Sequence, residues 1–524
     1  MMNGMEPRRR TSFRRNTLSA KAFGRSLKGR PAPVVATAAL AQRRLEGLQA
    51  LSGGARDQDP ESLEALADAS QSSASGVCST HRLLLRATMG FTQAELALVD
   101  EIGYYRYLGF QLNHEAIDDS FLEDILGQVF PTINLEPVEL FLNYQEDLQT
   151  PVLELILATV LRSLYSPKQL FERMVIFWTD HFNIDIFSDF GPYLKSTDDR
   201  EVIRRHALGK FPDLLEASAK SAAMLTYLTN DSNNKDHPNE NYARELMELH
   251  TLGADNGYTQ EDVREVARCF TGWTMSVGDD GGIPGRFHFL PSLHDFGAKT
   301  VLGQHIPSGG GIEDGERVLE ILAGHPNTAR FVATKLIRYF LTYDPPNHWV
   351  NLVAQVYLDT GGDIKAMLRE ILKRRWIDRA SPKLKRPYHL AISTARTISA
   401  DIDNLLFFAS GLFSMGHVPF TWSPPNGFPD SEGYWSGYLL PRWNFATTLL
   451  DIEEAGFSFQ QPLLKPNLSP AQLMRRIDWL LFNKSLPANA RRGIGRFLEE
   501  GPTNQIRIRQ ALGLAFSLPQ FQEY

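Results

Sequence analysis

The sequence has little cysteine and no long apolar run. Cys78 and Cys269 are the only cysteines among 524 residues, which excludes a disulfide framework and a cysteine-rich metal site. We expect both thiols to stay reduced, with Cys269 buried inside a helix. No apolar run approaches the length of a transmembrane helix.

Several catalytic motifs are also missing. The chain contains no HExxH, no paired ExxH and no GxSxG, so a zinc protease, a di-iron bundle and an α/β serine hydrolase are not supported. The glycine-rich segment SGGGIEDG at 308–315 lacks the Lys-Ser/Thr of a phosphate-binding loop. We expect a flexible connector there.

Basic charge is scarce outside the first thirty residues. Residues 1–30 carry nine Lys or Arg and one Glu, a balance of +8, and since the whole chain carries −7, the remainder carries −15. A nucleic-acid protein should present a basic face. The acidic body therefore argues against a nucleic-acid partner.

Residues 1–77 are expected to form a basic, disordered tail that ends in the linker SQSSASG at 70–76. The alternative is a tail that attaches the protein to an anionic partner or surface. The segment PAPVVATAALA at 31–41 is too short and too rich in proline for a convincing export leader. We therefore expect a cytoplasmic protein.

From Cys78 onward helical periodicity recurs, while strand-like alternation is confined to 286–290 and 300–302, which we expect to pair as one hairpin. The expected fold is mainly α: a large multi-helix body with long irregular loops and at most a small β-hairpin. Residues 78–524 are expected to form a single large helical domain, with a subdivision near 275–325. The helical patterns lie at 92–102, 152–165, 167–182, 198–208, 211–228, 312–323, 327–340, 349–360, 364–373, 385–398, 471–482 and 506–514.

Residues 236–273 hold the densest group of ionisable side chains, and their pattern predicts two helices. The first is expected to end near Gly253, a residue suited to a left-handed terminus. The second opens on a capping box of Thr259 and Asp262 and closes at Gly272.

The first of these helices carries two different faces. At about 100° per residue, Asn241, Arg244, Glu245 and Glu248 share one face and His250 lies on the opposite one. If the first face is solvated, Arg244 and Glu248 form an ordinary i,i+4 pair. If it is buried, the two carboxylates need a cation, a proton or a metal.

Two further histidines are candidate ligands. His181 falls on the aromatic side of the helix FERMVIFWTDHFNI, where it needs a hydrogen-bond partner or a metal. A core histidine bonded to a backbone carbonyl is the alternative. His294 and Asp295 lie in a loop, where ligand or base roles are common, the alternative being an Asx-type turn.

Two other segments have weaker signals. Lys335 and Arg338 form an exposed or interfacial basic edge, or an anion contact. The loop at 421–443 is dense in aromatic residues, and we expect it to cap a core rather than to stack on a flat ligand.

Eight segments, in order, resemble the bacterial domain-of-unknown-function 1800 family. Members of that family are often exported, and His417 replaces a glutamine that is common in the last motif. The resemblance covers most of the chain and implies an architecture and candidate sites rather than a reaction. The segments are HRLLLRATMGFT from His81, FWTDHF from Phe177, IRRHALGKFPDLL from Ile203, NENYARELMELHTLG and YTQEDVREVARCFTGW within 236–273, HDFGAKTVLG from His294, HPNTARFVATKLIRYF from His325, and MGHVPFTWSPPNGFPD from Met415.

Two functions fit these patterns. The first is a metal-dependent enzyme acting on an unidentified small molecule or polymer, with His181, Glu245 and Glu248 as catalytic residues and ligands of zinc, iron or manganese. The second is a non-catalytic helical scaffold or partner protein with buried polar networks. The residues expected to surround the site are Asn241, Arg244, His250, His294 and Asp295.

Overall fold

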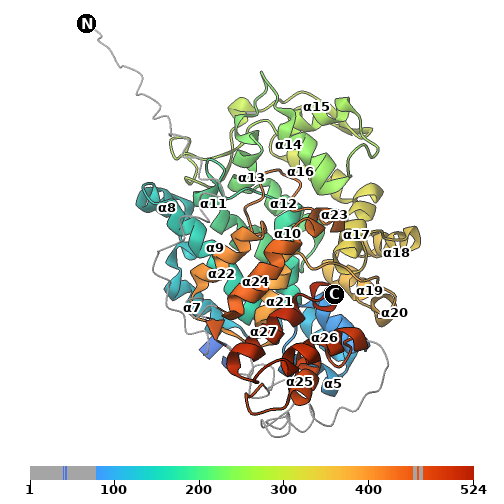
Figure 1. Cartoon of the computed structure of the whole chain (residues 1–524). Coiled ribbons are helices and arrows are strands. Elements are labelled where there is room, and N and C mark those ends of the chain that lie inside the picture. Colours follow the sequence, from blue (N-terminus) through green and yellow to red (C-terminus); the bar gives the residue numbers. More distant parts are fainter. Residues whose placement is uncertain (1–38, 41, 44–77, 452–456, 459–463) are drawn as a thin grey trace.

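The computed structural model describes residues 39–40, 42–43, 78–451, 457–458 and 464–524 (Figure 1). The expectations for the basic tail and linker at 1–77 fall outside these residues, apart from helical fragments at 39–40 and 42–43. In the part of the chain that is described, every helix is too short or too polar to cross a membrane.

The fold is mainly α, as the periodicity predicted. The first half contains α4 (Ser79–Ala87), α5 (Gln93–Ile102), α6 (Tyr104–Leu112), α7 (Ser120–Val129), α8 (Pro137–Tyr144), α9 (Gln149–Tyr165), α10 (Gln169–His181), α11 (Gly191–Asp198), α12 (Phe211–Ala219), α13 (Ala222–Tyr227), α14 (Glu240–Glu245) and α15 (Gln260–Cys269). The second half contains α16 (Glu313–Ala323), α17 (Pro326–Phe340), α18 (Asn347–Thr360), α19 (Ile364–Ile371), α20 (Arg374–Ile377), α21 (Pro387–Thr397), α22 (Leu405–Ser414), α23 (Glu432–Ser436), α24 (Leu439–Asp451), α25 (Pro470–Phe482), α26 (Ala488–Glu499), α27 (Gln505–Phe516) and α28 (Pro519–Gln522).

Short 3-10 and π-helical segments lie between or next to these α-helices. The predicted helix at 198–208 is instead the end of α11 followed by a π-helical turn at Asp199–Arg204, and a second π-turn, Leu246–Thr251, follows α14. Short 3-10 turns occupy His114–Ala116, Pro131–Asn134, Asn230–Ser232 and Pro291–Leu293.

The predicted pairing of the two strand-like segments is wrong. Each belongs to its own antiparallel pair: β2 (Phe287–Phe289) pairs with β1 (Trp273–Met275), and β3 (Lys299–Val301) pairs with β4 (Gln304–Ile306). A third pair joins β5 (Asp401–Ile402) to β6 (Phe457–Ser458). Each predicted strand thus pairs with another strand next to it in the chain and not with the other predicted strand.

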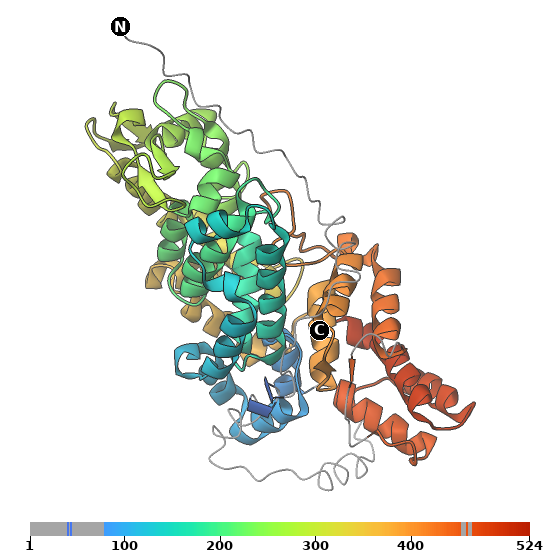
Figure 2. The ribbon, with the colours of Figure 1, turned by 90° about the vertical axis from the view of Figure 1, so that its left-hand side faces the viewer.

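Helix α10 lies between two hydrophobic cores. Its Met174 and Trp178 join a core built mostly from residues 83–377, whereas Ile176 joins one built mostly from α7, α9 and residues 388–521. Figure 2 shows the later helices, in orange and red, as a layer on one side of the rest. Every α10 residue except Asp180 is buried, so its polar side chains need partners inside the protein.

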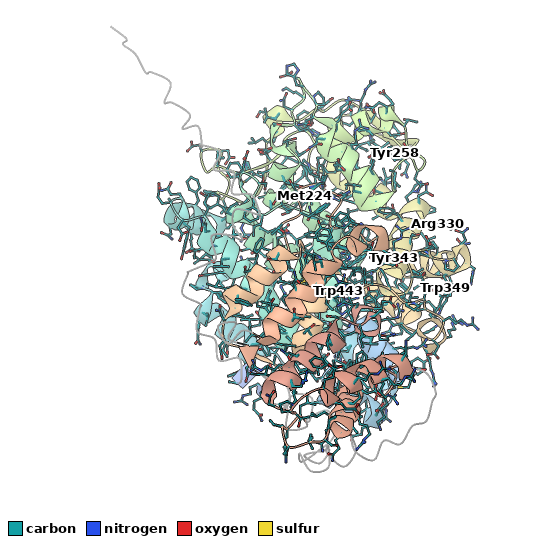
Figure 3. All side chains as sticks on the ribbon, in the orientation of Figure 1. Met224, Tyr258, Arg330, Tyr343, Trp349 and Trp443 are labelled. Atoms are coloured by element: carbon teal, nitrogen blue, oxygen red, sulfur yellow. The ribbon has the colours of Figure 1, made fainter. Side chains whose placement is uncertain are left out.

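Side chains fill the space between the helices (Figure 3). Met224 on α13 is fully buried, and Arg330 and Trp349 mark the adjacent helices α17 and α18. The single domain expected for 78–524 and the subdivision expected near 275–325 both stay predictions.

Candidate functional site

The C-terminal end of α10 is covered by the aromatic loop at 421–435. Asn183 donates hydrogen bonds of 2.8 Å to the backbone oxygens of both Trp422 and Pro424. Gly427 has a φ of +71°, and a Cβ there would overlap the Asp180 backbone oxygen. The loop therefore caps this helix end, as expected, and only glycine permits so close an approach.

Two buried histidines meet beneath this loop. His181 Nε2 lies 3.1 Å from the backbone oxygen of His250, and the two rings are 6.1 Å apart. A carbonyl oxygen only accepts, so Nε2 carries the hydrogen and Nδ1 the lone pair. Among the described residues, nothing hydrogen-bonds to His181 Nδ1 or His250 Nε2. Burial, then nearby Lys335, lowers the pKa of both rings, that of His250 to about 3, so both are neutral.

The two faces predicted for 240–253 are confirmed by burial, although the helical spacing changes after Glu245. Helix α14 ends there, and Leu246–Thr251 forms the π-turn, which closes its hydrogen bonds over five residues rather than four. Glu248 is still half-buried and His250 fully buried, as their predicted opposite faces require. Gly253 ends the segment with a φ of +92°, as predicted. Single π-turns occur often at functional sites.

The polar face of α14 is half-buried and only partly neutralised. Arg244 and Glu248 form the expected i,i+4 pair, at 3.8 Å. Glu245 has no ion pair within the described chain, and burial, then Glu248, raises its pKa. Asn241 is exposed and donates a 3.0 Å hydrogen bond to the backbone oxygen just after α13.

Tyr227 and Asp185 extend this carboxylate group. The Tyr227 hydroxyl donates to the Ser423 backbone oxygen in the aromatic loop. Burial raises the pKa of Tyr227, and the charges of Asp185 and Glu245 raise it further. Burial also raises the pKa of Asp185. Sequence patterns missed Tyr227 because nothing distinguishes it from a core residue of α13.

Lys335 on α17 borders the histidines on the other side. It is partly buried, makes no ion pair with a described residue, and places its ammonium 5.4 Å from the Phe331 ring centre. Burial lowers its pKa to about 8, against the opposing effect of Asp180. Burial raises the pKa of Asp180 to about 6, although its carboxylate pairs with Arg386. Arg386 also faces Asp430 at 3.6 Å.

The structure brings together only part of the predicted site. His181 makes no hydrogen bond or ion pair with Glu245 or Glu248; its polar partner is the His250 backbone. Within the described residues, no three His, Cys, Asp or Glu side chains are placed to hold a metal ion. The residues proposed for zinc, iron or manganese thus do not form a ready ligand set, and we derive no step through a metal.

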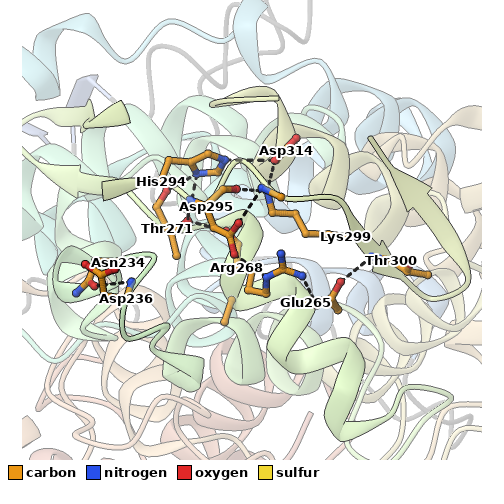
Figure 4. Close-up of polar contacts among 12 residues, drawn as sticks. Asn234, Asp236, Glu265, Arg268, Thr271, His294, Asp295, Lys299, Thr300 and Asp314 are labelled. Carbon is orange, nitrogen blue, oxygen red and sulfur yellow. Dashed lines mark hydrogen bonds and ion pairs between the residues drawn. The ribbon is translucent and has the colours of Figure 1, made fainter. Parts of the chain in front are cut away.

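His294 belongs to a separate buried network (Figure 4). Its Nδ1 lies 2.7 Å from the Thr271 backbone oxygen, and its Nε2 lies 3.2 Å from Asp314. The same Asp314 carboxylate pairs with the Lys299 ammonium at 2.5 Å. Each polar group is buried and partnered, so this cluster joins the hairpins to α15 and α16.

Asp295 forms the Asx-type turn that was the alternative to a ligand role. One oxygen accepts from the Gly297 amide at 2.8 Å, which is an Asx-type turn, and the other pairs with Arg268 at 2.7 Å. Arg268 also pairs with Glu265 on α15 at 2.6 Å. His294 and Asp295 contact none of His181, Glu245 and Glu248.

The comparisons with known proteins name a family but no activity. No curated protein and no solved structure matches the chain. A protein-family model matches residues 82–523, nearly the whole described body. The chain therefore belongs to the family described as "Protein of unknown function (DUF1800)".

Proposed function

We propose that the protein is an enzyme that uses general acid–base chemistry at the C-terminal end of α10. Lys335 is the proton carrier, and His181 accepts a hydrogen bond from the substrate through Nδ1. The substrate is a small molecule or polymer segment that presents an O–H or N–H group. The observation that carries this proposal is the buried His181 lone pair with no described protein partner, beside a lysine that has no ion pair.

The acid–base properties of the neighbouring groups support these roles. A catalytic group works best when its pKa lies near the operating pH. Burial lowers the pKa of Lys335 to about 8 and raises the pKa of Asp180 to about 6. Both values therefore lie closer to neutral pH than is usual for these groups. Pairs of groups shifted in this way are typical of acid and base assignments in enzymes.

Glu245 and Glu248 keep a catalytic role in this proposal as carboxylates beside the aromatic loop. The raised pKa of Glu245 suits a proton donor. The metal-dependent form of the proposal, with zinc, iron or manganese on His181, Glu245 and Glu248, requires these side chains to move together. Elemental analysis of the purified protein tests it, since a stoichiometric metal is then expected.

A helical scaffold is the second candidate, and a specific observation favours it. Several buried polar clusters are fully satisfied, such as Glu95, which pairs with Arg396 at 2.5 Å and caps its own helix through Thr92. Networks of this kind fix helix packing without catalysis. The end of α10 differs because His181 Nδ1 has no hydrogen-bond partner among the described residues.

The experiment screens the full chain against p-nitrophenyl esters, phosphates and glycosides, with Lys335→Met, His181→Gln and Glu245→Gln as variants. Loss of general acid–base catalysis should lower kcat by about 10²-fold or more, with little change in Tm for Glu245→Gln. Lys235→Met and Glu261→Gln alter exposed residues and serve as controls. If the variants lower the Tm, and kcat falls only as far as this unfolding explains, the result would favour the scaffold.

A further inference from the structure

Three buried cations from different parts of the chain gather around Arg173 of α10. They are Arg173 on α10, Lys385 just before α21 and Arg442 on α24, with exposed fractions of 2%, 1% and 0%. Figure 1 shows α10, α21 and α24 together in the middle of the molecule. None of the three forms an ion pair with a described carboxylate.

The guanidinium groups keep unused donors. Arg173 Nη1 lies 2.7 Å from His389 Nδ1, while its Nε and Nη2 have no hydrogen-bond partner among the described residues. Arg442 donates through Nε to the Gln522 side chain at 2.7 Å, while its Nη1 has no such partner. Buried donors without partners are rare in folded proteins, so these mark a place for an acceptor.

Lys385 feels the charge of both guanidinium groups. Its ammonium sits 4.0 Å from the Phe521 ring centre and has no carboxylate partner in the described chain. Burial, then Arg442 and Arg173, lowers its pKa to about 7. His81 and His389 also face it, and burial is the main cause that lowers the pKa of both rings.

The acids nearest to this cluster are already engaged. Asp430 pairs with Lys383 at 2.7 Å and faces Arg386, and Asp180 pairs with Arg386. The nearby Arg86 is a different case, because four backbone oxygens accept its hydrogen bonds. Uncompensated charge therefore remains on Arg173, Lys385 and Arg442, and burying such charge is costly without a counter-ion.

We propose that Arg173, Lys385 and Arg442 bind an oxyanion, the carboxylate or phosphate group of a small ligand. The unused groups of Arg173 and Arg442 are all donors, so a ligand that pairs with them must supply acceptors. The planar forks of two arginines match the oxygens of a carboxylate or phosphate better than a halide. This site is separate from the proposed catalytic groups, and its test does not depend on turnover.

The test measures binding of sulfate, as a tetrahedral stand-in for phosphate, and of acetate to the full chain by calorimetry and thermal unfolding. Chloride at equal ionic strength is the baseline. Sulfate also stabilises proteins generally by exclusion from their surface, so each measurement is repeated on Lys385→Met and on the exposed control Lys235→Met. Wild type and the control should bind at least one oxyanion, and Lys385→Met should lose at least tenfold in affinity.

The pH dependence has a defined sign. The bound anion favours the ammonium form of Lys385, so affinity should be constant below about pH 7 and fall by up to tenfold per pH unit above it. Binding of sulfate alone identifies a phosphate-type ligand, and binding of acetate alone a carboxylate. If Lys385→Met does not fold, Arg442→Met takes its place. Equal responses of wild type and variant, or no binding beyond chloride, would overturn the proposal.

Discussion

His181 donates a 3.1 Å hydrogen bond from Nε2 to the backbone oxygen of His250, and this contact joins the end of α10 to the π-turn at Leu246–Thr251. The contact fixes the tautomer of His181 and leaves its other ring nitrogen for a ligand.

Replacing His181 by Phe should therefore destabilise the protein more than replacing His250 by Phe. The His181→Phe variant removes a buried donor and leaves the His250 oxygen without it, at about 1–3 kcal/mol. His250→Phe is the matched control, because the His250 ring makes no described hydrogen bond that could be lost. Urea unfolding of both variants measures the difference. Equal losses would show that the hydrogen bond does not hold this junction.

The Asp314 network should be the most sensitive polar cluster near the hairpins. Asp314→Ala leaves Lys299 and His294 buried without their shared carboxylate, and removing one partner of a buried pair costs about 3–5 kcal/mol. The exposed pair Arg317–Glu320 supplies the control, since Glu320→Ala should cost under about 1 kcal/mol. Similar denaturation midpoints for the two variants would contradict a structural role for the network.

Gly427 should tolerate no side chain. Gly427→Ala places a Cβ against the Asp180 backbone oxygen at a positive φ, a strain of about 1–3 kcal/mol that also lifts the aromatic loop from α10. Gly493 in α26 has open space around it, so Gly493→Ala should instead stabilise by about 0.5–1 kcal/mol. Thermal unfolding compares them, and a fully stable Gly427→Ala variant would show that the loop does not lie there.

Local patterns predicted local structure well. The capping box of Thr259 and Asp262 opens α15 as expected, because both of its hydrogen bonds lie within four residues. The pairing of 286–290 with 300–302 failed because alternation identifies a strand but not its partner. The true partner of β2 is the three-residue strand β1, which is too short to stand out in the sequence.

The candidate site was less accessible to sequence reasoning. His181 was found from its place on an aromatic helix face, and its backbone carbonyl partner was one of the alternatives considered. The π-turn carries no repeating pattern, so it was not predicted, although His250 lies on the buried side as expected. Lys335 appeared as a basic edge, but its lowered pKa comes from burial, which only the folded chain supplies.

The most direct test of the proposed site is the titration of Lys335 in the native protein. Competitive labelling with trace acetic anhydride, followed by mass spectrometry, measures the reactivity of each lysine between pH 6 and 11. Lys335 should reach half-maximal reactivity at about pH 8, because burial favours its neutral form, whereas a solvated lysine titrates near about 10.4. Asp180→Asn should move the Lys335 midpoint lower, since Asp180 favours the ammonium form. A midpoint for Lys335 that coincides with that of exposed Lys235 would contradict the account.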